Sequence, residues 1–384
     1  MDPLKEFRGI DAPITRIALY KYDIFATKKF SFGTWTSHQH VFFCIEAGDQ
    51  TGWAENILAV NRPDAVPDEW AACLAELKGR SVTDALAFLR KKICLWEDRL
   101  TEAAEAALVD LAGKLTGRSA RQLLGLGGSG PVWGAYVILS DDAAFVREKA
   151  RWALEHGRSR YIKVKLFGKP ELDREVIRAV REICPRPDTF LLGDVNCGYR
   201  NEGEERPVEE IASSLRALYD EGLDACEDPA FLAAEEWVQL QRAVGQLALI
   251  PDYPLRPACR SIHRIREEMG GYYNIHPGCT GSILDAAALA GRVRQLGAGL
   301  MIGDDSLVGP GCAIWQQLAA WLEADWVEAT EKEGESDFYF RAVRSLPTDS
   351  RQNPIPVQPE TAGFGLVLDE SALREQAAAV REIR

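Results

Sequence analysis

The chain contains 384 residues, of which 46% are hydrophobic, and it has 58 acidic against 45 basic side chains, a formal net charge of −13. A chain of this length predicts one large domain together with a smaller one. The acidic balance argues against a nucleic-acid backbone or an anionic membrane as a partner, although local basic patches are compatible with it.

Nine cysteines are scattered along the chain and form no Cys-x-x-Cys pair. Their odd number and their position in apolar runs predict buried, reduced thiols, which are typical of a reducing compartment. No apolar stretch has the length of a signal peptide or of a membrane span. We therefore expect a cytoplasmic protein that has no membrane partner.

The first part of the chain predicts a mixed α+β unit. Residues 14–20 alternate apolar and polar side chains, and residues 41–46 form an apolar run before a glycine-containing turn, so both are expected to be strands. Residues 23–35 between them are rich in aromatic and small side chains, which favours a flexible loop. Residues 101–114 begin with Thr and end near a Gly, as an amphipathic helix does. His38 and His40 flank the second strand and are expected at the surface.

From about residue 130 onward, short apolar runs alternate with helical patterns, which predicts successive strand–helix units. Candidate strands begin at residues 133, 161, 190, 223, 247, 272 and 299, with one more near Trp326. Candidate helices cover residues 142–155, 172–183, 209–219, 235–244 and 282–296. This alternation is typical of a parallel βα barrel. A Pro- and Gln-rich stretch after residue 345 leads to a final helix, and this tail has the length to return to the first domain.

Charged side chains stand at the ends of the predicted barrel strands. Lys163 and Lys165 share one face of a strand, and Asp194, Glu227 and Asp252 end the next three. The carboxyl ends of parallel strands meet at one rim of a barrel, so these side chains are expected together. Three carboxylates would repel one another there unless a hard dication lay among them.

Each of these residues also has a structural interpretation. The three carboxylates are suited to capping the helices that follow, and the two lysines to the surface of an edge strand. Three carboxylates in register favour a metal. The apolar neighbours of the lysines indicate a buried strand, in which two idle lysines would be costly.

Five motifs in order carry a family resemblance. They are Thr51-Gly-Trp-Ala-Glu55, residues 105–114 with Leu-Leu-Gly-Leu-Gly at 123–127, Lys163-Val-Lys165, the three strand-end carboxylates, and Asn274-Ile-His276-Pro-Gly278. The chain thereby resembles the enolase superfamily, in its mandelate racemase and muconate-lactonizing branch. The resemblance implies an α+β capping domain (1–128), a TIM-like barrel of the (β/α)7β type (129–345) and a C-terminal segment (346–384) that returns to the capping domain. It also implies a dimer or an octamer.

The resemblance further implies roles at the rim. Asp194, Glu227 and Asp252 would hold Mg²⁺, and Asn196 would orient the metal or the substrate. Lys165 would transfer the proton, while Lys163 would hold the substrate carboxylate and lower the pKa of its neighbour by like charge. Removal of a proton α to a carboxylate leaves an enediolate, whose charge a divalent metal can neutralise.

The chain departs from the family pattern at two places. His276 stands where relatives usually carry a lysine opposite the Lys165 position, and it is suited either to acid–base chemistry or to a structural role beside Pro277. Asp304 and Asp305 lie near the position of a glutamate in many relatives. They are interpreted either as substrate ligands or as loop residues.

A segment that closes over the substrate in relatives corresponds here to the region of Phe32 and Trp35, which are candidate substrate contacts or ordinary core. The leading hypothesis is a racemase or epimerase of a carboxylate substrate, in which Lys165 and His276 serve opposite faces. A hydroxy-acid or sugar-acid dehydratase, with His276 as general acid, is the alternative. A catalytically silent binding protein is the third.

Overall fold

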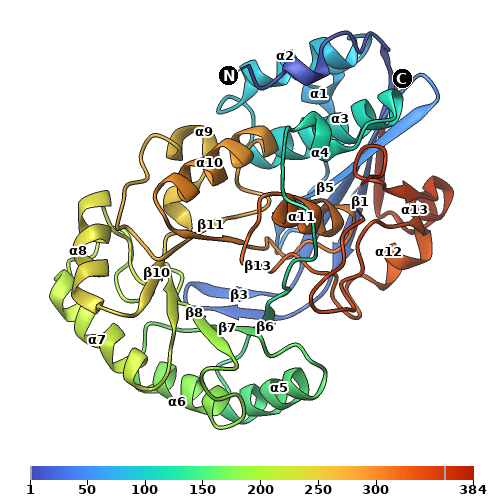
Figure 1. Cartoon of the computed structure of the whole chain (residues 1–384). Coiled ribbons are helices and arrows are strands. Elements are labelled where there is room, and N and C mark those ends of the chain that lie inside the picture. Colours follow the sequence, from blue (N-terminus) through green and yellow to red (C-terminus); the bar gives the residue numbers. More distant parts are fainter. Residues whose placement is uncertain (1, 359) are drawn as a thin grey trace.

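The computed structural model describes residues 2–358 and 360–384 (Figure 1). After a short turn, η1 (Lys5–Phe7), the N-terminal part forms a four-stranded antiparallel sheet in the order β16-β1-β4-β5. Its strands are β1 (Ile14–Ile24), β4 (His38–Ala47), β5 (Gln50–Val60) and β16 (Ala379–Ile383). The helices beside it are α1 (Asp68–Leu74), η2 (Ala75–Leu77), α2 (Val82–Lys92), α3 (Asp98–Thr116) and α4 (Ala120–Leu123).

Parallel strands form a closed barrel below this sheet. They are β6 (Tyr136–Ile138), β7 (Tyr161–Lys165), β8 (Phe190–Asp194), β9 (Ala225–Glu227), β10 (Ala248–Ile250), β11 (Tyr272–Ile275), β12 (Gly299–Ile302) and β13 (Trp326–Val327). Two backbone hydrogen bonds complete the ring: Asn274 N donates to Pro251 O at 3.0 Å, and Ala135 N donates to Val327 O at 2.9 Å. The predicted fold class, a (β/α)7β barrel with an α+β cap, is confirmed.

Helices cover the outside of the barrel, as Figure 1 shows for α5 to α8. They are α5 (Ala143–Glu155), α6 (Pro170–Arg181), α7 (Val208–Asp220), α8 (Ala234–Val244), η3 (Tyr253–Leu255), α9 (Ala258–Ser261), α10 (Ile283–Gln295) and α11 (Pro310–Trp321). In the described part of the chain, no helix combines the length and the apolar character that a membrane crossing requires.

The alternation of side chains along each strand places the polar rim directly above a cluster of apolar side chains that fills the barrel. Leu192, Ala225, Ile250 and Trp326 form a separate inner cluster, sealed by the rings of Tyr161 and neighbouring aromatic residues. Successive side chains on a strand point to opposite faces, so the next inward positions after these residues belong to the charged side chains. The barrel is therefore packed below and polar at its carboxyl end.

The segment expected as a flexible loop is a β-hairpin, so that prediction is wrong for residues 28–35. β2 (Lys28–Phe30) pairs antiparallel with β3 (Gly33–Trp35), and the rings of Phe30 and Phe32 stack with their centroids 5.1 Å apart. These aromatic contacts give the segment a fixed shape. We call residues 28–35 the flap.

The prediction that His38 and His40 lie at the surface is also wrong. Both are 0% exposed within β4, which lies between β1 and β5. Of the nine free cysteines, four are buried as expected, and the expectation of burial is wrong for the five that are half-buried. The half-buried residues are Cys73, Cys94, Cys197, Cys259 and Cys279.

The C-terminal segment returns to the first sheet. It runs through α12 (Asp337–Ala342), β14 (Val343–Ser345), β15 (Val367–Leu368) and α13 (Glu370–Gln376) to β16, which pairs antiparallel with β1. Near its middle, Gly363 crosses α3 closely: Ala120 N donates to Gly363 O at 2.7 Å, and Phe364 N donates to Asp110 Oδ1 at 2.8 Å.

This crossing predicts the effect of Gly113→Ala. A Cβ added at Gly113 would lie 2.3 Å from the Gly363 Cα, so backbone would have to move, and we expect a loss of about 2–4 kcal/mol of unfolding free energy. Gly291→Ala in α10 is the control, because nothing lies within 4 Å of its added Cβ, and it should be neutral or stabilising. Urea unfolding measures both, and equal midpoints for Gly113→Ala and the wild type would contradict the close crossing.

Candidate active site

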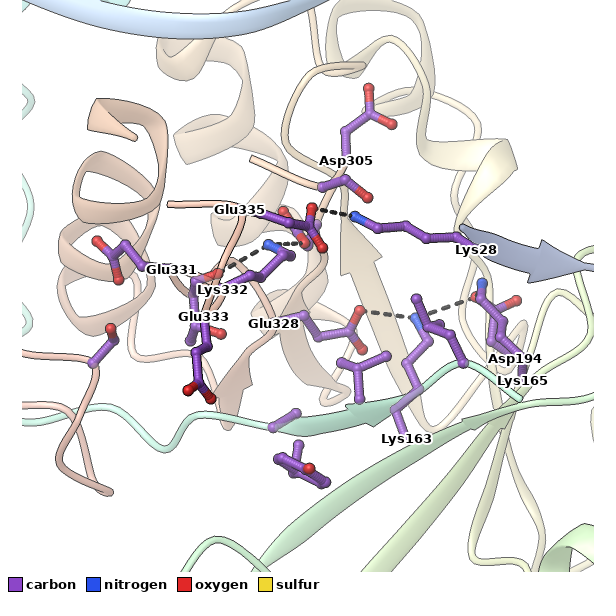
Figure 2. Close-up of a pocket in the computed structure, with 18 of the residues that line it drawn as sticks. Lys28, Lys163, Lys165, Asp194, Asp305, Glu328, Glu331, Lys332, Glu333 and Glu335 are labelled. Carbon is purple, nitrogen blue, oxygen red and sulfur yellow. Dashed lines mark hydrogen bonds and ion pairs between the residues drawn. The ribbon is translucent and has the colours of Figure 1, made fainter. Parts of the chain in front are cut away.

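A cavity of about 790 Å³ lies at the carboxyl end of the barrel strands, bordered by the flap (Figure 2). Of the predicted site residues, all but Glu227 line it: Lys163, Lys165, Asp194, Asn196, Asp252, His276, Asp304, Asp305, Phe32 and Trp35. Glu227 lies at the end of β9 beside Asp194 and is 1% exposed. The chain thus brings these residues together, while their chemical roles stay predictions.

Lys163 lies at the centre of a group of buried charged side chains. Its Nζ lies 2.6 Å from Glu227 Oε2, 2.8 Å from Glu328 Oε2 and 3.2 Å from Asp194 Oδ2. Figure 2 shows Lys163 between Glu328 and Asp194. Burial alone would lower the pKa of this lysine, but the surrounding carboxylates, Glu227 foremost, raise it well above its ordinary value. Lys163 is therefore a fixed cation, which holds the three carboxylates together.

Glu328 was not among the predicted residues. It follows β13 two positions after the inward-facing Trp326, just as Asp194 follows Leu192 on β8. The same alternation rule would have identified it. Its Oε1 is buried and has no hydrogen-bond partner among the described residues.

Lys165 lies next to the cavity and is held from two sides. Its Nζ donates to Asp194 Oδ2 and, at 2.9 Å, to Asn196 Oδ1, and it lies 5.0 Å from the centre of the Phe30 ring in the flap. Asn196 adopts a left-handed backbone (φ 46°). Burial would raise the pKa of Asp194, but Lys165 and Lys163 lower it below its ordinary value. Asp194 is consequently an anion that positions the amine.

Asp252 is paired with an arginine that the sequence analysis did not single out. Arg256, four residues on, donates Nε to Asp252 Oδ1 at 2.9 Å and Nη2 to Oδ2. Asp228 fixes the backbone here by accepting the N–H groups of Asp252 and Tyr253 at 2.9 and 3.1 Å. Side chains four residues apart are neighbours on a helix. Because the sequence predicted no helix at this point, the spacing alone gave little reason to expect this pair.

His276 is neutral in this setting. Burial and the nearby Arg256 guanidinium lower the pKa of its imidazole. Its Nδ1 lies 2.9 Å from the carbonyl oxygen of Pro277, an acceptor, so Nδ1 carries the proton and Nε2 has a free lone pair. The imidazole can therefore accept a proton in the cavity.

Helix α3 of the cap positions the loop that follows His276. Glu102 accepts hydrogen bonds from Gly278 N at 2.7 Å, Thr280 N at 3.0 Å and Thr280 Oγ1 at 2.8 Å. Arg99 pairs with Asp305 at 2.7 Å, and Lys332 pairs with Asp304 at 2.8 Å. Both aspartates predicted as substrate ligands thus already have a cationic partner.

A chain of buried polar groups holds the flap. Lys28 Nζ lies 2.8 Å from Glu335 Oε2 in the loop after β13 (Figure 2). His38 Nε2 lies 3.1 Å from the same oxygen. His38 in turn contacts His40, whose Nδ1 is 2.8 Å from Glu55 Oε1. Burial lowers the pKa of His38 to about 4, while His38 and Lys28 outweigh burial and lower the pKa of Glu335 to about 2.

The rim holds more carboxylate groups than cationic side chains, an excess that fits a divalent cation. Burial, with repulsion from Asp194 and from Asp252, raises the pKa of Glu227 and of Asp228 well above the ordinary value. Five buried carboxylates face three cationic side chains: Asp194, Glu227, Asp228, Asp252 and Glu328 against Lys163, Lys165 and Arg256. Oε2 of Glu227 lies 2.6 Å from Lys163 Nζ, but among the described residues no donor meets it with hydrogen-bond geometry. Oxygen ligands of this kind suit Mg²⁺. Among the described residues, a group of three or more ligand side chains with atoms all within 4.8 Å of one another occurs only at Cys44, Glu46 and Glu370, where Arg16 occupies the space. Asp194, Glu227 and Asp252 do not form such a group, so binding a metal would require their side chains to move closer.

The comparisons with known proteins agree with this geometry. No protein-family model matches the chain. The L-Ala-D/L-Glu epimerase of Escherichia coli K12 is 28% identical over 203 residues, which are 52% of this chain and 58% of that protein. The match therefore spans less than two thirds of the curated relative.

Solved structures match over nearly the whole chain. The N-succinyl Arg/Lys racemase from Bacillus cereus has a TM-score of 0.77 and 20% identity, covering 97% of this chain and 100% of its own. A dipeptide epimerase from Cytophaga hutchinsonii, complexed with Mg and D-Ala-L-Val, has a TM-score of 0.79, 20% identity and the same coverage. The muconate lactonizing enzyme from Pseudomonas fluorescens gives 0.78 and 19%, covering 96% and 100%. These relatives are members of the enolase superfamily, and the chain has the fold of that superfamily.

The Lys28–Glu335 pair predicts that Glu335→Gln loosens the flap. The substitution leaves a buried ammonium without its counter-charge, a change that destabilises by about 3–5 kcal/mol when the charge stays buried. Because the flap is a separate two-stranded sheet that pairs with no other described strand, we expect it to open instead, and its backbone amides to exchange with deuterium at least ~10-fold faster. Glu333→Gln, an exposed neighbour on the same loop, is the control. Unchanged exchange over residues 28–35 in Glu335→Gln would show that the pair does not hold the flap.

Proposed function

We propose that the chain is a Mg²⁺-dependent racemase or epimerase, which removes and returns the proton α to the carboxylate of an amino-acid derivative. The observation that carries this proposal is the position of the Lys165 amine. Asp194 and Asn196 hold it beside a cluster of buried carboxylates, at the carboxyl end of the strands of the closed barrel. The racemase and epimerase names of the relatives support the reaction class.

Asp194, Glu227 and Asp252 would hold the metal, Asp252 in the presence of its Arg256 partner. When bound, the dication would neutralise charge that develops on the substrate carboxylate. The excess of buried carboxylates over cations supports this assignment, as does the Mg in the structure of the dipeptide epimerase.

Two proton-transfer groups are available in the cavity. Lys165, in its neutral form, would take the α-proton on one face, and Asp194 would stabilise the ammonium that results. His276, with its proton on Nδ1, would accept through Nε2 on the other face. When neutral Lys165 takes the proton, protonated His276 returns one from Nε2 to the opposite face. In the reverse direction neutral His276 takes the proton and the Lys165 ammonium returns one, so the configuration inverts and the atoms balance.

The dehydratase alternative requires His276 to start as a protonated acid. Racemisation also needs a protonated His276 when Lys165 takes the proton, so the pKa of His276 does not separate the two reactions. The racemase and epimerase names of the relatives favour racemisation. Lys163 is already engaged with three carboxylates, so we propose that it organises the metal-binding carboxylates and adds positive charge near the substrate carboxylate.

Exchange of the α-proton in D₂O tests the proposal. With Mg²⁺ and pooled N-acyl amino acids and dipeptides, the wild type should exchange α-protons of both configurations and form no product other than the inverted isomer. Lys165→Ala should lose exchange from one configuration by roughly 10²–10⁴-fold, and His276→Asn from the other, because each residue serves one face.

Lys29→Ala is the matched control, since that flap lysine is exposed and pairs with Asp141 on the surface. Proton NMR with each pure enantiomer reads out the result. Keto-acid signals would instead identify a dehydratase. Exchange that persists unchanged in Lys165→Ala would contradict the assignment of the base.

A further inference from the structure

Two cysteines from different parts of the fold meet at the interface between cap and barrel. Cys94 follows α2 in the N-terminal part, and Cys259 lies in α9 of the barrel, 165 residues further along the chain. Their Sγ atoms are 2.6 Å apart, closer than the ~3.5–4.0 Å at which non-bonded heavy atoms pack. Two thiols so close are in position for a covalent bond.

The backbone at Cys94 is also unusual, as it is at Cys197 (φ 63°), for which no contact with a second sulfur atom is recorded among the described residues. Cys94 has a φ of 65°, in the left-handed region that favours glycine or asparagine. A cysteine nevertheless occupies the position, and its side chain lies against the only sulfur that approaches it among the described contacts.

The surroundings hold the two sulfur atoms in place and leave them accessible. Arg90, at the end of α2, donates to Ser282 Oγ at 3.0 Å and to Asp285 Oδ1 at 2.7 Å, which fastens α2 to the barrel. Both cysteines are half-buried, so a small oxidant in solution can reach them. The fully buried cysteines of the core lack this access.

We propose that Cys94 and Cys259 are a redox-modification site, at which a disulfide cross-links the cap to the barrel. The oxidant is a low-molecular-weight disulfide such as glutathione disulfide. The Cys94 thiolate attacks one of its sulfur atoms and releases one thiol; the Cys259 thiolate then attacks the Cys94 sulfur and releases the second. Two protein thiols are oxidised, and one external disulfide is reduced to two thiols.

The cross-link would restrain a segment that belongs to the candidate site. Cys259 lies three residues after Arg256, the partner of Asp252, and a bond to Cys94 ties this segment to the corner between α2 and α3. A loop of 165 residues is closed, so the unfolded chain is strongly constrained. Burial and the adjacent Cys94 sulfur raise the pKa of the Cys259 thiol to about 12, which makes the closing step slow at neutral pH.

The test uses the full chain, incubated with glutathione disulfide in mildly alkaline buffer and then alkylated. Peptide mass spectrometry should find one linked pair of peptides containing Cys94 and Cys259, with two fewer titratable thiols. The thermal midpoint should rise by roughly 5 °C and return on reduction with dithiothreitol. Cys94→Ser and Cys259→Ser should each abolish the link and the shift, and Cys73→Ser, also half-buried, should leave both unchanged.

Three outcomes would overturn the proposal: nine thiols that still titrate after oxidation, separate glutathione adducts without a link, or a link that involves another cysteine. The peptide map of the wild type decides the matter even where a serine variant fails to fold.

Discussion

The charged rim of the barrel depends on the ammonium group of Lys163. Asp194, Glu227 and Glu328 come from three different strands, and each lies within 3.2 Å of this one nitrogen. Three ionised carboxylates in a buried space would repel one another, and the removal of a buried counter-charge costs about 3–5 kcal/mol. Lys165 pairs in register with Asp194, and Asp194 with Glu227, so the strand order brings the charged side chains to one rim; Lys163, two residues before Lys165 on β7, reaches the same carboxylates. Lys165, two residues on, is then presented to the cavity.

Helix α3 connects this rim to the cap. Its Arg99, Glu102 and Glu105 are spaced three residues apart, so they lie along one side of the helix. Arg99 binds Asp305, Glu102 accepts from the loop that carries His276, and Glu105 accepts from Ser282 Oγ at 2.7 Å. A helix that looks amphipathic in the sequence is thus buried nearly all round, and its polar side chains satisfy the backbone of the barrel loops. These hydrogen bonds and the Arg99–Asp305 ion pair join the cap to the candidate site.

The sequence predicted the features that follow from local periodicity. Apolar runs ending in carboxylates identified the strands, and the two-residue alternation of a strand then places Lys163, Lys165, Asp194 and Asp252 at one rim. Glu328 follows the same alternation, so its position at the rim could also have been predicted from the sequence.

The partnerships of Arg256, Lys28 and Glu335 were not predictable, because each depends on where a loop from elsewhere in the chain comes to rest. The burial of His38 and His40 has the same origin. It follows from the position of β4 inside the sheet and from Glu335, some 300 residues away in sequence, which no local pattern indicates.

The rim around Lys163 holds more buried carboxylates than cationic side chains, and we infer that it forms a site for a dication. Calorimetric titration of the full chain with Mg²⁺ tests it most directly. We expect one ion bound per chain, with the affinity lowered at least ~100-fold in Asp194→Asn and in Glu227→Gln. Asp305→Asn should bind as the wild type does, because that carboxylate is paired with Arg99 outside the cluster. Equal binding by Asp194→Asn and the wild type, or no binding by the wild type, would contradict it.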